Sequence, residues 1–238
     1  MRTAEIYKLR TQRTPILCAA VLLIGVLAPS VVLIWYTPTD SAAYTDAWIG
    51  TFEALALVFA IVFGGWLLGT EYRQDTVKRV LTSEPRRLRA LATKGVVGAV
   101  AMSTVFATSA GIGWMAARAV GSSHGVSVPW DGRSVLAFIV TALIPFTVAY
   151  SLSAITKSDS FAMVGTVAMV FVFEPLISLI PRVGDYTIGR GMASFEQAMT
   201  GEVDDFATLS AGAATVTLVV WLAALVTSAA ALFATRDV

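Results

Sequence analysis

The sequence has few of the residues that carry most enzyme chemistry. Its 238 residues include one cysteine, Cys18, and one histidine, His124. A single cysteine excludes an intrachain disulfide, and one imidazole with no nearby cysteine does not make a metal site. No Gly-Lys dipeptide occurs, which excludes a phosphate-binding loop of the Walker type. These absences predict a chain that is not an enzyme and that holds no cofactor of its own.

Charged residues are also scarce, at 14% of the chain, against about 25% in soluble domains. Hydrophobic residues make up 56% and are concentrated in long runs. Six of these runs are long enough to cross a bilayer as helices: about 15–36, 47–68, 95–120, 134–156, 161–180 and 208–234. The sequence therefore predicts an all-α membrane protein in which residues 15–238 form a single domain of six transmembrane helices.

The distribution of basic residues predicts the topology. Residues 69–94, which we call the polar island, separate the second and third runs and hold seven of the seventeen basic residues. Thirteen of the seventeen fall on the side shared by the polar island and both termini, which the positive-inside rule assigns to the cytoplasm. We therefore expect a multi-pass protein of the inner (plasma) membrane. Residues 181–207 form an outer segment, for which an amphipathic helix at the interface and an acidic loop are both compatible with the sequence.

Residues 1–14 precede the first run and carry four basic residues and one acid. Their apolar side chains recur at helical spacing, which favours an amphipathic helix along the inner interface, with its basic face toward anionic headgroups. A disordered basic tail is the alternative.

The polar island itself contains a helical pattern. Val77, Val80 and Leu81 share one face, and Pro85 interrupts the pattern because it lacks the N–H that a helix needs. We expect two short helices with an elbow at Glu84 and Pro85, the second of which, residues 86–94, continues into the third span. A basic loop adsorbed on anionic lipid is the alternative.

The island also carries the residues of a family pattern. These are Glu71, then Asp75-Thr76-Val77, then Val80-Leu81-Thr82, Pro85, Arg87 or Arg89, and Lys94. This order resembles the loop between spans two and three of the type-2 ATP-binding-cassette (ABC) export permeases, which reads Glu, Gly-Thr-Leu, Leu-Leu-Thr-x-Pro-x-x-Arg, Lys. Asp75 stands where the family usually has Gly. The start of the chain also resembles the Glu-x-x-Lys-Leu-Arg of small bacterial members, through Glu5, Lys8, Leu9, Arg10 and Arg13.

The resemblance implies a function and a set of partners. It implies a permease subunit that pairs with a second copy or a paralogous permease and that docks on nucleotide-binding subunits, which bind ATP and Mg. Residues 1–14 would be the elbow helix and residues 69–94 the coupling segment. The partner-coupling residues would be Glu71, Thr76, Val77, Val80, Leu81, Pro85, Arg87 and Lys94. Lipid is a further partner and nucleic acid is not expected. The apolar spans suit export of a lipophilic or amphipathic substrate, such as a drug, a peptide antibiotic or a lipid.

Two acidic residues lie inside the apolar runs, Glu53 in the second and Glu174 in the fifth. A charged side chain at mid-membrane costs about 2.5 to 3.5 kcal/mol on insertion scales, so such residues face a bundle interior or a water-filled cavity. We predict that both line the translocation pathway, with Pro175 weakening the helix where a gate would bend. Snorkelling to the outer surface is the alternative.

Other classes of membrane protein remain compatible with the sequence. A proton-coupled secondary transporter would use Glu53 and Glu174, although the two halves show no obvious inverted repeat. A non-transporting sensor or immunity protein is the other alternative. Co-purification with an ATPase subunit separates the ABC permease from both.

Overall fold

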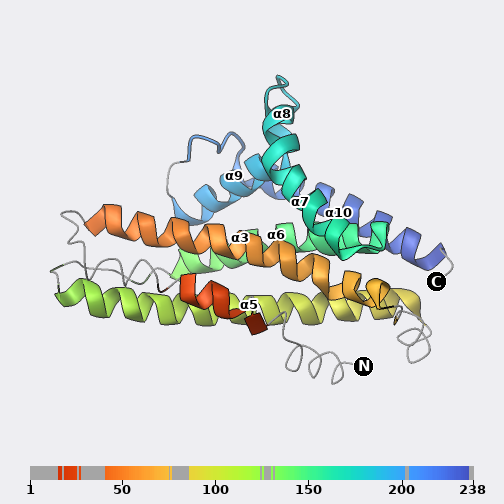
Figure 1. Cartoon of the computed structure of the whole chain (residues 1–238). Coiled ribbons are helices and arrows are strands. Elements are labelled where there is room, and N and C mark those ends of the chain that lie inside the picture. The colour runs from red at the N-terminus through yellow and green to blue at the C-terminus, as the bar shows by residue number, and fades with distance from the viewer. Residues whose placement is uncertain are drawn as a thin grey trace.

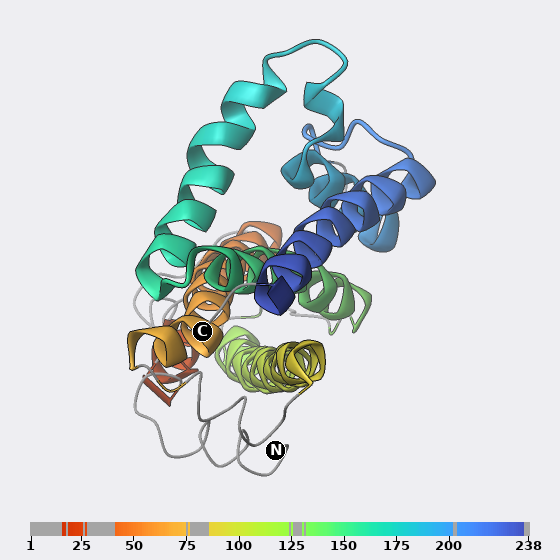
Figure 2. The same ribbon diagram turned by 90° about the vertical axis from the view of Figure 1, so that its right-hand side faces the viewer.

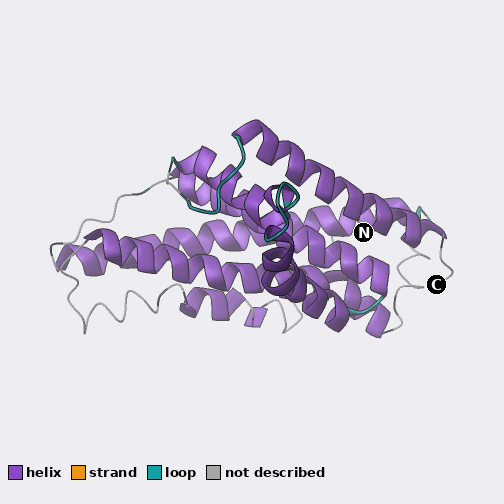
Figure 3. Cartoon of the chain, turned by 90° about the horizontal axis from the view of Figure 1, so that it is seen from above, coloured by secondary structure: helices purple, strands orange, loops and turns teal. Residues whose placement is uncertain are grey.

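The computed structural model describes residues 16–17, 19–25, 27, 41–74, 76, 86–123, 125, 130, 132–201 and 204–235. In this part of the chain all regular structure is helical, and no strand occurs (Figure 3). Five stretches are long and apolar enough to cross a membrane, namely Gly50–Arg73, Arg87–Ser123, Gly132–Thr156, Asp159–Ser178 and Ala211–Thr235. The prediction of an all-helical membrane protein is thus confirmed, with five of the six predicted spans.

The remaining predicted segments lie largely outside this part of the chain. Residues 1–14, the predicted elbow helix, are not described, and neither are residues 77–85, which contain most of the predicted coupling helix. Of the first predicted span, 15–36, the described residues 16–17, 19–25 and 27 are helical. The first predicted span, the elbow helix and the coupling helix therefore stay predictions.

The helices follow the predicted runs and extend beyond several of them. Their bounds are α3 Ser41–Arg73, α5 Arg87–Ser123, α6 Gly132–Thr156, α7 Asp159–Ala168, the π-helix η1 Met169–Phe173, α8 Glu174–Ser178, the 3-10 helix η2 Gly184–Tyr186, α9 Ile188–Thr200 and α10 Ala211–Thr235. The largest difference is at α3, which continues into the polar island because backbone hydrogen bonding does not stop where the apolar residues do and no proline interrupts these turns. The start of α5 at Arg87 agrees with the predicted helix over residues 86–94 that continues into the third span.

The centre of the bundle is formed by α3 and α6, the most extensively packed pair of helices. In Figure 1, α3, α5 and α6 lie side by side, and α9 and α10 lie above them. The C-terminal ends of α3, α6 and α10 and the N-terminal end of α5 lie at one end of this bundle, the right-hand end in Figure 1. We call it the basic end.

An aromatic core joins the three central helices. Phe52 of α3 lies 4.8 Å from Phe138 of α6, and Phe59 of α3 lies 5.5 Å from Phe106 of α5, between ring centroids. Phe106 in turn lies 5.7 Å from Phe138. Lipid is as apolar as these side chains, so their close packing, and not escape from water, stabilises the contact between helices.

Two glycines let α7 approach α3 closely. A Cβ added at Gly69 would lie 2.4 Å from the Cα of Asp159, and one added at Gly65 would lie 2.9 Å from Cγ of Met163. Gly65 and Gly69 are four residues apart and therefore lie on one face of α3. The GxxxG spacing of the sequence is thus a packing surface for the start of α7.

From this contact α7, η1 and α8 diverge from the bundle. Figure 2 shows them as an arm that leads away from α10, with α9 on the return path. Only 11% of the residues in the most apolar stretch of this arm are buried, against 67% in α3. In η1 the hydrogen bonds span five residues, as in the bond from the Glu174 N–H to the Met169 carbonyl. Such π-helical turns are rare and occur often at functional sites.

The outer segment contains a helix, α9, so the alternative of an acidic loop is wrong for residues 188–200. Thr187 caps its first turn, because its Oγ1 accepts the Arg190 N–H at 3.4 Å. Gly201 ends it at a φ of 79°, a conformation that glycine adopts without strain. Met192 and Phe195 of α9 pack against a small core of Ile144, Val148, Ile188 and Leu218. The apolar face of α9 therefore covers α6 and α10.

Gly69 should be essential to the packing of α7 on α3. We expect Gly69→Ala to lower the free energy of unfolding by about 1–3 kcal/mol, because the new methyl group would meet backbone atoms that cannot move alone. Gly111→Ala is the matched control, since a Cβ there has nothing within 4 Å. Unfolding in mixed detergent micelles, followed by circular dichroism, measures both variants. Equal stability of the two variants would contradict this packing.

Candidate functional site

A buried ion pair joins the two ends of the polar island. The Lys94 Nζ of α5 donates to Oε1 of Glu71 in the last turn of α3. Lys94 is 1% exposed and Glu71 is 5% exposed, although both belong to the most polar stretch of the chain. The pair closes the base of a loop that leaves α3 and returns as α5.

The surrounding helices hold Lys94 in place. Tyr150 of α6 lies beside the first turns of α5, and its hydroxyl donates to the Leu91 carbonyl at 2.7 Å. Gly95, directly after Lys94, allows this approach, since a Cβ there would lie 3.2 Å from the Tyr150 ring. On the α3 side, Thr70 donates its hydroxyl back to the Trp66 carbonyl at 2.8 Å. Each charged side chain therefore projects from a well-packed helix.

Burial makes the two charges of this pair depend on each other. Moving a carboxylate or an ammonium out of water costs several kcal/mol, and mutual attraction at close range offsets this cost only while both charges are present. A buried pair of this kind contributes little net stability compared with apolar residues. It strongly disfavours any arrangement in which α3 and α5 separate at this point.

Two further contacts join the polar island to other helices. Arg73 Nη1 lies 2.9 Å from Oδ2 of Asp159, the first residue of α7. Arg87 Nη1 donates to the Ala234 carbonyl in the last turn of α10 at 3.3 Å. Both arginines flank the connecting residues 74–86. The polar island is thus attached to α7 and α10 as well as to the bundle core.

The structure describes four of the eight predicted coupling residues and brings three of them, Glu71, Thr76 and Lys94, together. Glu71 and Lys94 form the ion pair, and Arg87 contacts α10. Thr76 folds back on α3, where its N–H donates to the Glu71 carbonyl at 2.9 Å. The other four, Val77, Val80, Leu81 and Pro85, lie outside the described residues.

Glu174, predicted to line the pathway, lies at the first turn of α9. Its Oε2 accepts the Gly189 N–H at 2.6 Å, so the carboxylate caps a helix that begins fourteen residues later in the chain. Glu174 also lines a cavity of about 130 Å³ between α6, η1 and α9. Pro175 follows at the start of α8, where its missing N–H disrupts no helical bond of α8 itself.

A scan of the sequence against models of protein families and a search of curated proteins both find no match.

Glu53, the other predicted pathway residue, lies half-buried on α3. Leu57, one turn further along α3, lines the cavity that contains Glu174, and Glu53 is not among the described lining residues. The role of both glutamates in a pathway stays a prediction.

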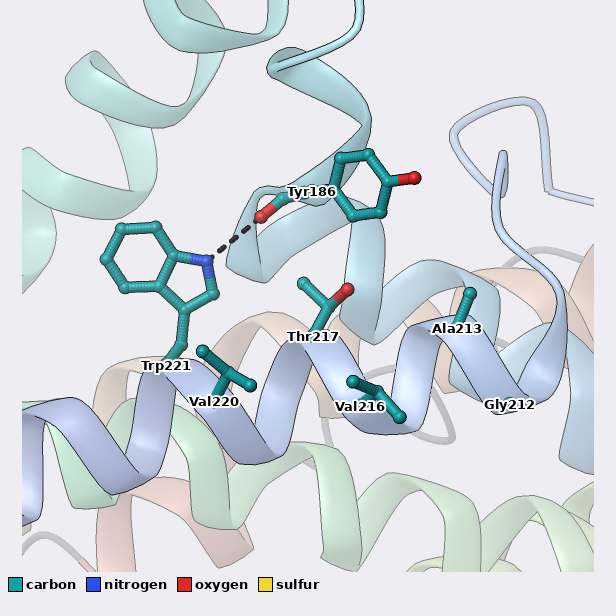
Figure 4. Close-up of a pocket in the computed structure, with 7 residues that line it drawn as sticks. All are labelled: Tyr186, Gly212, Ala213, Val216, Thr217, Val220 and Trp221. Atoms are coloured by element: carbon teal, nitrogen blue, oxygen red, sulfur yellow. Dashed lines mark hydrogen bonds between the residues drawn. The ribbon is translucent and has the colours of Figure 1, made fainter.

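A second hollow lies along α10 near the return of the chain from α8. It has a volume of about 420 Å³ and is lined by Tyr186, Gly212, Ala213, Val216, Thr217, Val220 and Trp221 (Figure 4). The Trp221 indole N–H donates to the Tyr186 carbonyl at 2.9 Å, which fixes the wall at which η2 meets α10. The remaining lining is apolar except for Thr217, so this hollow offers no charge to a ligand.

Sequence reasoning did not single out Asp159 and Tyr150. The sequence marks Asp159 only as a residue of a helix start, because it follows the capping residue Ser158. The Ser158 Oγ accepts the Phe161 N–H at 3.2 Å. Its partner Arg73 is distant in sequence, and no spacing rule connects the two. Tyr150 lies within an apolar run, where a phenol is ordinary. Among the described residues, no group of three or more His, Cys, Asp or Glu side chains gathers where it could hold a metal ion.

Removing one partner of the buried ion pair should destabilise the fold. We expect Lys94→Met to lower the free energy of unfolding by about 3–5 kcal/mol, because the Glu71 carboxylate stays buried without the ammonium. Arg89→Met is the matched control, since Arg89 is an exposed cation on the same helix. It should change stability by no more than about 0.5 kcal/mol. Unfolding in mixed micelles measures both, and a Lys94→Met variant as stable as the control would contradict the pair's burial.

Proposed function

We propose that this chain is the transmembrane permease subunit of an ATP-driven exporter that resembles the type-2 ABC permeases. In this proposal the basic end faces the cytoplasm of the inner (plasma) membrane, and the polar island docks on a nucleotide-binding subunit. The substrate is lipophilic or amphipathic. ATP and Mg bind to the partner, and a second permease subunit completes the assembly.

The buried Glu71–Lys94 pair is the observation that carries this proposal. Glu71 and Lys94 are the first and last residues of the motif that resembles the family's coupling segment. A coupling segment must pass the motion of a partner to the helices, so its two ends need firm attachment to them. A loop that only rests on lipid does not need its ends to be firmly attached to the helices. Burying two charges at the ends of such a loop would cost free energy without a benefit.

The contacts around the pair support the same function. Asp159 and the Ala234 carbonyl connect the island to α7 and α10, so a displacement of the island would reach helices on both sides of the bundle. Beyond the contact of α7 with α3, η1 and α8 have no buried residues and so have little packing to resist such a displacement. Movement at the basic end would therefore be transmitted to this arm.

The test of this function is whether the chain assembles with an ATPase subunit through the island. We expect the full chain to co-purify with a nucleotide-binding subunit and to stimulate its ATPase activity. Leu81→Asp should abolish both, because docking depends on an apolar contact. Lys78→Gln should have little effect, although adsorption to anionic lipid would weaken by about 1 kcal/mol for each basic residue removed.

Two results would contradict the proposal. Absence of an ATPase subunit from the purified chain would favour the alternatives, which are a proton-coupled transporter and a non-transporting sensor or immunity protein. If a subunit does accompany the chain and both Leu81→Asp and Lys78→Gln leave assembly and ATPase stimulation intact, docking through this face of the island is wrong.

A further inference from the structure

The cavity beside Glu174 combines one carboxylate with an otherwise apolar wall. Its described lining residues are Leu57, Ile144, Pro145, Val148, Thr166, Met169, Val170, Glu174, Ile188, Gly189 and Met192. Four different parts of the fold contribute to it, namely α3, α6, the arm of α7, η1 and α8, and α9. The side chain of Thr166, the other polar lining residue, already donates to the Ala162 carbonyl at 2.8 Å. Glu174 is therefore the group through which this cavity can select a ligand.

The position of the Glu174 carboxylate is fixed by its contact with α9. The Gly189 N–H binds Oε2 at 2.6 Å, and the positive end of the α9 dipole stabilises a negative charge at this point. Only glycine permits this approach, since a Cβ at residue 189 would lie 2.2 Å from Oε2. The carboxylate is thus held at the cavity wall by an arrangement that a larger residue at 189 would displace.

The electrostatics of the cavity favour a cation. No basic side chain is among the described residues that line it. Arg190, which follows Gly189, is engaged elsewhere, because its Nη1 lies 3.0 Å from Oδ1 of Asp185. Apolar surroundings weaken screening, so the attraction between Glu174 and a cation would be stronger here than at a surface.

The size of the cavity fits only part of a ligand. Its volume of about 130 Å³ lies below the range of about 300–1,000 Å³ that holds drug-sized molecules. The arm continues from the cavity as an exposed apolar surface at Phe171, Val172 and Phe173. A small charged head would occupy the cavity, and an apolar body would lie along this surface. Met169 and Met192 have flexible side chains that adapt to heads of different shape.

We propose that this cavity binds the positively charged head of a lipophilic amine or quaternary ammonium compound, with Glu174 as the counter-ion. The assignment of lipophilic cations as the exported substrates rests on the proposed function. Binding of such a cation requires only the cavity and the Glu174 carboxylate.

Binding to the purified full chain in maltoside micelles tests the proposal. Radiolabelled decyltrimethylammonium is the cationic probe and decanol is its neutral counterpart, each measured by equilibrium dialysis. Partition into micelles is the same for every variant, so differences between variants report on the site. We expect saturable binding of decyltrimethylammonium to the unmodified chain. Glu174→Gln should weaken this binding by at least about tenfold, because it removes the charge and keeps the side chain's size. Binding of decanol should not change.

A glycine pair provides a second test that leaves the charge in place. Gly189→Ala should weaken binding of decyltrimethylammonium because the methyl group displaces the Glu174 carboxylate, a flexible side-chain end that can move without unfolding the chain. Gly212→Ala is the matched control, because a Cβ there has nothing within 4 Å, and its binding should equal that of the unmodified chain. If Glu174→Gln fails to fold, the comparison of Gly189→Ala with Gly212→Ala still tests whether the cavity binds the cation.

Several outcomes would overturn the proposal. Absence of saturable binding to the unmodified chain would do so, as would equal binding by the Glu174→Gln and Gly189→Ala variants and the unmodified chain. An equal loss of decanol binding in Glu174→Gln would show that the variant disturbs the cavity and that no cation is selected. The measurement uses the chain without an ATPase subunit, so its failure is separate from failure of the proposed export function.

Discussion

The buried ion pair between Glu71 and Lys94 is the constraint on which the basic end of the bundle depends. Each charge alone would cost several kcal/mol in this environment, so the fold is stable only while α3 and α5 hold the two side chains together. The pair therefore fixes where the polar island leaves α3 and where it returns as α5. The contacts of Arg73 with α7 and of Arg87 with α10 then attach the same segment to the outer helices.

Close helix packing complements the ion pair, and this packing is confined to the centre of the molecule. Aromatic rings connect α3, α5 and α6, and Gly65 and Gly69 bring the start of α7 against α3. Beyond that contact the arm of α7, η1 and α8 is mostly exposed, and the Glu174 carboxylate joins it to α9. The centre is tightly packed and the arm is loosely packed. A movement at the basic end would therefore displace the arm more easily than the centre.

The sequence predicts the membrane class and five of the observed spans well, because long apolar runs and scarce charge are local properties. Glu174 stands out as a charge within an apolar run, whereas Glu71 and Lys94 were singled out through the pattern that resembles the ABC permease loop. Their partners could not be predicted: Lys94 is 23 residues from Glu71 and Gly189 is 15 from Glu174, and both contacts arise from the packing of separate helices. The bounds of α3 were predicted too short, because hydropathy marks the apolar part of a helix and not its hydrogen bonding. Whether residues 188–200 form a helix was open, since acidic residues lie next to the apolar face of α9.

A double-mutant cycle on the ion pair tests the account most directly. Glu71→Gln, Lys94→Gln and the double variant are unfolded in mixed micelles, and the coupling energy is obtained from the free energies of unfolding. A buried pair predicts that the double variant is more stable than the sum of the two single effects implies, with a coupling of about 1–3 kcal/mol. Single effects that add to within about 0.5 kcal/mol would contradict the claim that this pair holds the polar island to the bundle.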